Sequence, residues 1–314
     1  MKTTHRNYSE EQGDFNRLAR FFTVHAASKR THTTWCLGRL VDWKYGLYNN
    51  KRAFPSFCNE NAHLWFDGFG ELAGFAISES GDAGFSILTP DGYRFLYEEM
   101  LEWVLETWKG RTSAESPFET EITEYQDWEI KILERYGFCS DLTFFTRRFD
   151  LTGPLPSRVP LEPGFVIVDM QSHPDYRAQG ILRADAFQKK SSLTEEELND
   201  RLRYFNHNHN GPIYHPETDL CVMAEDGQFV AGCEALINAH GLEADIERVC
   251  THSNFRKRGF ARAVIQECLY RLRDRGIHNA YITGYSPEAL ALYASLGAID
   301  EVKAFFYEKG ASLD

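Results

Sequence analysis

The sequence predicts an α/β (α+β) protein of two tandem domains with the same plan, each a central sheet flanked by helices. Three observations support this fold class. A strand, a basic loop and a long amphipathic helix follow one another over residues 245–272. A hairpin precedes this unit, and a strand, a helix and a last strand follow it. The same order of elements occurs a second time about 160 residues earlier in the chain.

The most informative segment lies where the long helix begins. Residues 245–251 alternate as in a strand and lead to the turn residues Ser253 and Asn254, and apolar residues then recur with helical spacing over 260–272. Between strand and helix lies a cluster of cations, RKRGFAR, at residues 256–262. A helix N-terminus already carries a partial positive charge, so cations gathered there indicate that an anion, most simply a phosphate, binds.

Each part of this loop has a predicted role in holding phosphates. Gly259 and the small Ala261 let the backbone approach a bulky ligand, and Arg256 and Arg258 can fork onto phosphate oxygens. The loop has neither the three-glycine motif of dinucleotide folds nor the Gly-Lys-Ser/Thr ending of a P-loop. The backbone N–H groups expected to bind phosphate belong to Lys257, Arg258, Gly259, Phe260, Ala261 and Arg262.

Further elements complete one domain around this loop. They are, in chain order, two strands over 219–225 and 229–237, a strand over 280–284, a helix over 287–296 and a last strand over 302–308. Asp226-Gly227 is a strong turn dipeptide, so the first two strands form a predicted hairpin. Ser286 is the predicted N-cap of the helix, Pro287 occupies its first position, and Gly297 ends it.

The loop and the second helix resemble the GNAT superfamily of acetyl-CoA-dependent N-acetyltransferases. The family's pyrophosphate motif, Arg/Gln-x-x-Gly-x-Gly/Ala, is matched over residues 256–261. Its helix motif, Asn-x-x-Ala-x-x-x-Tyr-x-x-x-Gly, is matched at Ala289, Tyr293 and Gly297, with Ser286 in place of Asn, which weakens one expected polar contact to the cofactor. The resemblance implies mixed, mostly antiparallel sheets flanked by helices, acetyl-CoA as co-substrate and no metal.

N-acetyl transfer needs a base, because a lysine-like amine with an ordinary pKa of ~10.4 is almost fully protonated at neutral pH. Glu247, on the strand before the loop, is the predicted base, and Asp245 on the same face or a water molecule are alternatives. The resemblance implies that Tyr293 protonates the leaving thiolate or stabilises its charge. It also implies that the backbone at Val249 and Thr251 faces the pantetheine arm, with a bulge near Val249 whose N–H binds the oxyanion.

The earlier copy has lost the residues of this chemistry. Residues 133–138 repeat the pattern of 293–298. The loop of the earlier copy, however, has Asp91 where a cation is expected, and Leu133 stands where the later copy has its tyrosine. Because a carboxylate repels phosphate, we expect the earlier copy to be degenerate and structural.

The predicted domains are a degenerate N-terminal GNAT-like domain at 1–152, a proline-rich linker at 153–164, and a C-terminal GNAT domain at 165–314 that carries the acetyl-CoA site. This plan resembles the two-copy architecture of the mycothiol synthases, although nothing in the sequence indicates their substrate. The expected activity is acetyl transfer to a primary amine of a small molecule by direct attack.

The composition of the chain indicates which kinds of partner it binds. The 314 residues carry a formal net charge of -12, which argues against nucleic acid and suits a cationic amine substrate. No apolar run reaches the ~18 residues of a membrane span and the polar start is not a signal peptide, so we expect a cytoplasmic protein with no membrane partner. Seven cysteines without a C-x-x-C pair indicate free thiols. Nothing in the sequence predicts the oligomeric state.

Three alternatives stay open. His207, His209 and His215 invite a metal site, but no carboxylate or cysteine lies at a familiar ligand spacing, so a polar loop beside the acceptor pocket fits better. A non-catalytic acyl-CoA-binding or regulatory protein would keep the cofactor site without turnover. A peptidyl or aminoacyl transferase using charged tRNA is disfavoured by the acidic composition and the intact loop motif.

Overall fold

The computed structural model describes residues 2–26, 34–45, 56–113, 116–190, 192–208 and 211–310. The chain divides into two compact units. The first unit comprises Met1–Phe144 and Val302–Asp314, and the second comprises Phe145–Glu301.

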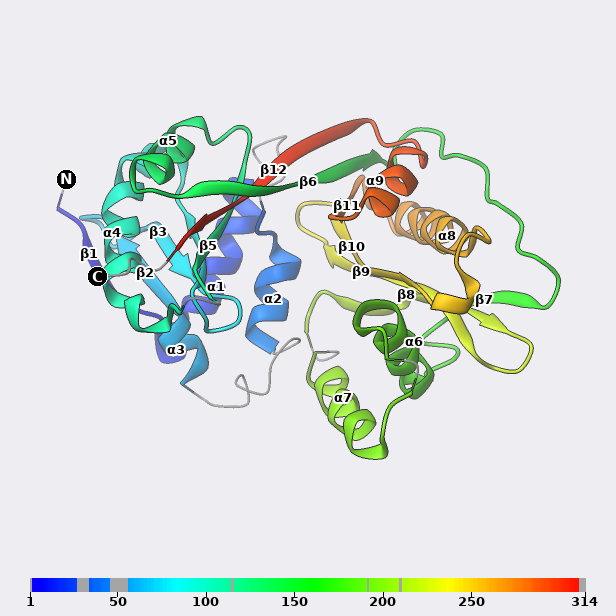
Figure 1. Cartoon of the computed structure of the whole chain (residues 1–314). Coiled ribbons are helices and arrows are strands. Elements are labelled where there is room, and N and C mark those ends of the chain that lie inside the picture. Colours follow the sequence, from blue (N-terminus) through cyan, green and yellow to red (C-terminus); the bar gives the residue numbers. More distant parts are fainter. Residues whose placement is uncertain are drawn as a thin grey trace. The chain divides into compact units, whose positions relative to one another are not determined.

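The first unit is a mixed sheet between two layers of helices (Figure 1). Its strands lie in the order β1-β2-β3-β4-β5-β12, and every pair except the parallel β4–β5 is antiparallel. The strands are β1 (Thr4–Asn7), β2 (Ala62–Phe66), β3 (Leu72–Ile77), β4 (Gly84–Leu88), β5 (Phe118–Thr123) and β12 (Asp300–Lys309). The helices are α1 (Asp14–Arg20), α2 (Leu37–Tyr45), α3 (Phe57–Asn61), α4 (Tyr97–Thr107) and α5 (Asp127–Arg135).

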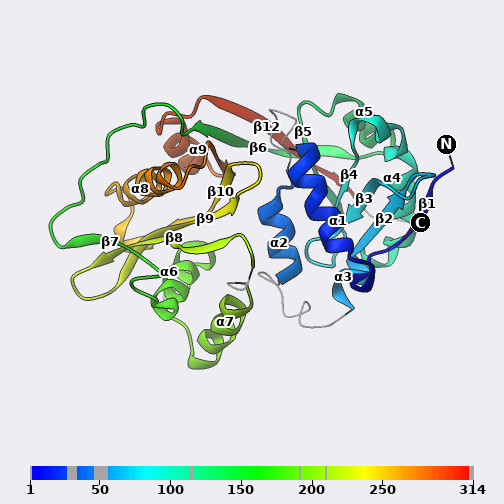
Figure 2. The ribbon, with the colours of Figure 1, turned by 180° about the vertical axis from the view of Figure 1, so that it is seen from behind.

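Each face of this sheet has its own core. Helices α1, α2 and α3 cover one face with an aromatic core that includes Trp43 and Phe75 (Figure 2). Helices α4 and α5 cover the other face, against Trp65 and Phe85. Almost every residue of β2 and β3 is buried, because the two-residue period of a strand sends neighbouring side chains into opposite cores.

The second unit repeats this plan in the order β7-β8-β9-β10-β11-β6, with β10–β11 as its parallel pair. Its strands are β6 (Cys139–Asp150), β7 (Phe165–Asp169), β8 (Tyr214–Ala224), β9 (Phe229–Asn238), β10 (Glu243–Thr251) and β11 (Asn279–Gly284). Its helices are α6 (Tyr176–Gln188), α7 (Glu195–Asn208), α8 (Phe260–Asp274) and α9 (Pro287–Ala294). The core on one face includes α8 and α9, and α6 packs on the other face.

The two copies exchange their closing strands, so the units divide the chain elsewhere than the predicted domains 1–152, 153–164 and 165–314. Residues 145–150 of β6 pair with β11 in the second unit, and residues 304–309 of β12 pair with β5 in the first. Both closing strands have apolar residues at alternating positions, and neither pattern specifies which sheet its strand joins. The sequence therefore reveals the repeat and leaves the exchange undetermined.

The predicted elements of the later copy form where expected. The strand before the loop is β10, the hairpin is β8–β9 with Gly227 at φ 86°, and the two helices are α8 and α9. In the earlier copy, the loop is instead a short 3₁₀ helix at Asp91–Leu96. None of the described helices is long and apolar enough to cross a membrane.

Candidate functional site

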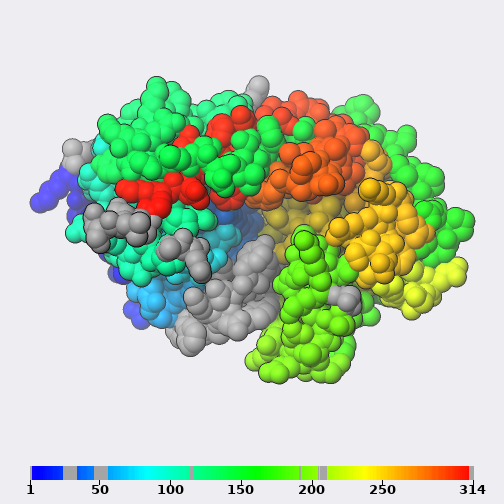
Figure 3. All heavy atoms as spheres, viewed as in Figure 1, coloured from blue at the N-terminus to red at the C-terminus, as the bar shows by residue number. Residues whose placement is uncertain are grey.

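The loop between β10 and α8 exposes a row of unpaired backbone donors. Lys257 and Gly259 both have left-handed backbones, with φ of 60° and 83°. Such alternation turns successive N–H groups toward one side and makes an anion-binding concavity. Within the described chain, no N–H from Lys257 to Arg262 donates to an acceptor, and the first turn of α8 has no acidic residue and no side-chain cap. This loop lies at the surface, where an anion can reach it (Figure 3).

Two contacts fix the loop in place. Asp185 on α6 accepts hydrogen bonds from the backbone N of Ser253 at 2.5 Å and from its hydroxyl at 2.8 Å. Burial opposes ionisation of Asp185, but these bonds outweigh it and its pKa is lowered. On the other side, the buried ring of Phe260 lies 4.6 Å from the ring of Phe165. Phe260 therefore anchors the helix start and offers a ligand only its backbone.

The cations of the loop have different partners. Arg256 and Lys257 are exposed, and Nε of Arg256 donates to the carbonyl of Thr251 at 3.4 Å. Arg258 pairs with Glu162, with Nε and Oε1 3.2 Å apart, and this contact lowers the pKa of Glu162. Arg262 donates to the carbonyl and hydroxyl of Ser295, at 3.0 and 2.5 Å, just after α9. The side chain of Arg262 thus ties α8 to α9, and its predicted phosphate contact is limited to its N–H.

The strand before the loop contains the predicted bulge. The register between β10 and β9 shifts between Glu247 and Cys250, and Arg248 within the bulge has φ 52°. The parallel pairing of β10 with β11 ends at Asp245, opposite Tyr281. Glu247 thus follows the last paired position, at the point where β10 and β11 separate.

Tyr293 lies on α9 with 5% of its surface exposed. A Cβ added at Gly284 on β11 would lie 3.1 Å from Cδ2 of Tyr293, so glycine there allows the ring to approach the strand. Its hydroxyl makes no hydrogen bond to any described residue, and burial followed by the charge of Glu247 raises its pKa. The two predicted catalytic side chains, Glu247 and Tyr293, are therefore close enough to interact electrostatically. Ser286 caps α9, with its Oγ 3.2 Å from the N of Ala289.

A network of buried charges, which no sequence motif predicted, lies beside the bulge. Asp219 and Glu234 are 0% exposed, and Arg183 on α6 donates to them at 3.5 and 2.9 Å. Arg248 donates to the other oxygen of Glu234. Burial, and next the charge of Glu234, raises the pKa of Asp219. The sequence held a signal at Glu234, which is the one charged residue in the mostly apolar β9.

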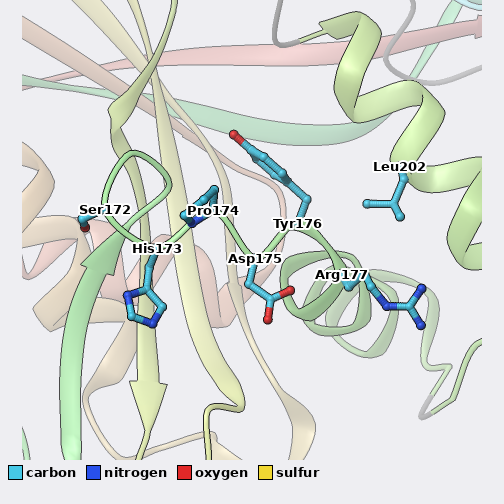
Figure 4. A pocket seen from close by; sticks show the side chains of 7 residues that line it. All are labelled: Ser172, His173, Pro174, Asp175, Tyr176, Arg177 and Leu202. Atoms are coloured by element: carbon cyan, nitrogen blue, oxygen red, sulfur yellow. The ribbon is translucent and has the colours of Figure 1, made fainter.

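A shallow pocket of about 450 Å³ lies at the start of α6 (Figure 4). It is lined by Ser172, His173, Pro174, Asp175, Tyr176, Arg177 and Leu202. The hydroxyl of Tyr176 lies 3.4 Å from that of Tyr214, which donates to Asp219 at 3.0 Å.

The histidine-rich segment lies largely beyond the described structure. His209 and the side chain of His207 lie outside the described residues, and His215 lies on β8. No group of three metal-ligating side chains occurs among the residues that the structure describes. The seven cysteines, all within the described residues, form no disulfide.

Residues 182–298 match the acetyltransferase (GNAT) family. The chain carries a GNAT acetyltransferase domain. The matched residues include the loop, the bulge and Tyr293. Comparison with curated protein sequences finds no matching relative.

The likeness to solved structures covers both units. A GCN5-related N-acetyltransferase from Sphaerobacter thermophilus matches with a TM-score of 0.65 and 19% identity, covering 98% of this chain and 96% of that one. A tandem GNAT protein from the clavulanic acid biosynthesis pathway matches with a TM-score of 0.69 and 12% identity over 100% of both chains. The chain thus has the fold of a tandem GNAT protein.

Proposed function

We propose that the second unit transfers the acetyl group of acetyl-CoA to a primary amine of a small molecule by direct attack. One observation carries this proposal. The unpaired N–H groups of the loop at 257–262, the separating strands β10 and β11, and the largely buried side chain of Tyr293 occur together in one unit. Phosphates would bind at the loop, with Arg256 and Arg258 as further cations, and the thioester would lie along β10.

Glu247 is the base that the geometry favours. Asp245 lies where β10 is still paired with β11, whereas Glu247 comes after that pairing ends. Asp245 is also 8% exposed, while Glu247 is half-buried and more open to an incoming amine. The base takes a proton from the amine, and the N–H of Val249 in the bulge stabilises the oxyanion that forms as the amine adds to the carbonyl.

Tyr293 would act on the leaving group. A thiol has an ordinary pKa of about 8.5, well below that of a phenol, and the pKa of Tyr293 is raised further. Complete proton transfer from Tyr293 to the thiolate is therefore unfavourable. We expect its hydroxyl to stabilise the thiolate by a hydrogen bond, with the proton arriving later from solvent.

Transfer through an acetyl-cysteine intermediate is disfavoured. Cys250 lies in the same strand, directly after the bulge, and is 5% exposed. Burial raises its pKa to about 12, so its thiolate is scarce at neutral pH. Direct attack by the amine needs no such intermediate.

The first unit would bind no acetyl-CoA, because internal contacts occupy the residues of its loop. Tyr93 donates to Asp67 at 2.6 Å. Arg94 donates to both oxygens of Glu129, at 2.8 and 2.5 Å.

The acceptor would be a small amine that is attracted by the negative net charge of the protein. We propose that the reaction takes place in the cytoplasm.

The test combines acetyl-CoA with panels of polyamines, amino sugars and amino acid amines. Release of the CoA thiol together with an acetylated product, identified by mass, would support the proposal. Binding of acetyl-CoA without transfer to any amine would favour the non-catalytic acyl-CoA-binding alternative. Acetyl transfer that persists undiminished in Tyr293→Phe would contradict the assigned role of this hydroxyl.

A further inference from the structure

We infer that Arg248 and Glu234 are positioning residues that hold the bulge of β10 in the conformation the reaction needs. Arg248 adopts φ 52°, a left-handed backbone that a residue with a Cβ keeps only when its surroundings impose it. Its side chain is 8% exposed, and its guanidinium donates to Oε1 of Glu234 on the neighbouring strand. The strained residue is thus anchored by its own side chain.

Glu234 also lies in line with the predicted base. It pairs with Glu247 on β10 and with Asp219 on β8. Residues directly opposite in antiparallel strands share a face, with Cβ atoms about 4.5–5.5 Å apart. Three carboxylates therefore form a row across the sheet, from the buried Asp219 to the half-buried Glu247.

Arg183 and Arg248 compensate the negative charge of this row of carboxylates. A buried carboxylate without a partner is strongly destabilising, and Glu234 has Arg183 at 2.9 Å on one oxygen and Arg248 on the other. Without Arg248, the charge of Glu234 is less compensated beside Glu247, and the bulge loses its anchor. Both effects displace the base and the N–H of Val249.

The phosphate loop would be spared. It is fixed separately by the bonds of Asp185 to Ser253, at 2.5 and 2.8 Å. Loss of the Arg248–Glu234 pair should therefore impair the chemical step and leave acetyl-CoA affinity nearly unchanged. This effect on turnover rests on the proposed function, whereas the effect on the bulge does not.

The test uses Arg248→Met and Glu234→Gln in the full chain, with three readouts. We expect amide hydrogen exchange in peptides covering 245–252 to be at least about tenfold faster than in the wild type. The Kd for acetyl-CoA, measured by calorimetry, should stay within about threefold. Thiol release with the panel amine that the wild type acetylates fastest should fall by about 30-fold or more.

Controls separate positioning from general damage. Arg271→Met removes another arginine of the unit, paired with Asp169 at 2.6 Å and Glu267 at 3.0 Å, and should change none of the readouts. Arg248→Lys should restore part of the turnover. The double variant R248M/E234Q removes both charges together, so it tests the pair even where a single variant fails to fold.

Unchanged exchange at 245–252 in a folded Arg248→Met protein would overturn the inference. An equal loss of acetyl-CoA affinity and turnover would also overturn it, because a positioning role predicts that they separate. If the proposed function is wrong, the wild type will acetylate no amine. The exchange measurement would still decide whether the Arg248–Glu234 pair holds the bulge.

Discussion

In the proposed reaction, the hydroxyl of Tyr293 stabilises the leaving thiolate. Tyr293→Phe removes the hydrogen bond to the developing charge and leaves the ring packed against Gly284. We expect kcat to fall by about 100-fold while the Kd for acetyl-CoA changes less than twofold. Tyr270→Phe is the matched control, because that hydroxyl contacts the carbonyl of Pro156 on the exposed side of α8. A Tyr293→Phe enzyme with wild-type kcat would exclude the hydroxyl from the reaction.

If the loop binds phosphate as proposed, the carboxylate of Glu162 would compete with that phosphate for Arg258. Glu162→Gln frees the guanidinium, which also lies 4.9 Å from the centre of the Phe260 ring at the helix start. We expect acetyl-CoA to bind a few-fold more tightly, at most about fivefold, with the difference shrinking as salt is added. Weaker binding in this variant would show instead that Glu162 orients Arg258 for the ligand.

Single residues also show what the sequence could reveal about the site. Arg256, Gly259 and Tyr293 belong to short local patterns, and such patterns fix where each residue lies on its own element. The ion pair of Glu234 with Arg183 joins residues 51 positions apart on different elements. No local pattern encodes that contact, so the sequence could mark Glu234 as unusual without naming its partner.

Among the elements, the loop before α8 depends on the backbone of Gly259. Its φ is 83°, and a Cβ there would meet nothing within 4 Å, so the cost of a side chain is conformational and not steric. We expect Gly259→Ala to cost about 1–2 kcal/mol and to weaken acetyl-CoA binding. Gly92→Ala in the 3₁₀ helix of the first unit is the control, since Gly92 has no left-handed backbone. Thermal unfolding and calorimetry of both variants test this, and equal effects of the two changes would argue against it.

We expect His63, on β2, to make the first unit sensitive to acid. Nε2 of His63 is hydrogen-bonded to Nδ1 of His5 at 2.8 Å. The ring of His63 stacks on Trp103, with the ring centres 3.8 Å apart. Burial, and next the charges of His5 and Arg6, lowers its pKa to about 4. Between pH ~6.5 and ~4 the unfolded chain therefore binds a proton that the folded unit excludes.

Stability from the neutral His63 is complete above pH ~6.5 and is lost as the pH falls toward 4, by up to about 3 kcal/mol. His63→Phe removes this titration and keeps a ring. We expect the wild type to lose more thermal stability than the variant between pH 7 and pH 4.5. Parallel losses in both proteins would rule out His63 as the source.

For the whole molecule, the repeat was predictable and the strand exchange was not. Residues 133–138 and 293–298 show the duplication in the sequence itself. Which sheet each closing strand joins depends on contacts between distant parts of the chain, and β6 and β12 have equivalent patterns. The same comparison of copies predicts that only the second unit binds acetyl-CoA, because Arg94 and Tyr93 are held by Glu129 and Asp67 in the first.

Calorimetric titration tests whether the loop at 256–262 is the acetyl-CoA site. Acetyl-CoA is titrated into the wild type and into the variant carrying Arg256→Ala and Arg258→Ala. We expect one molecule bound per chain with a Kd on the order of micromolar, and at least about tenfold weaker binding in the variant. No binding by the wild type, two sites per chain, or equal affinity in the variant would contradict this assignment.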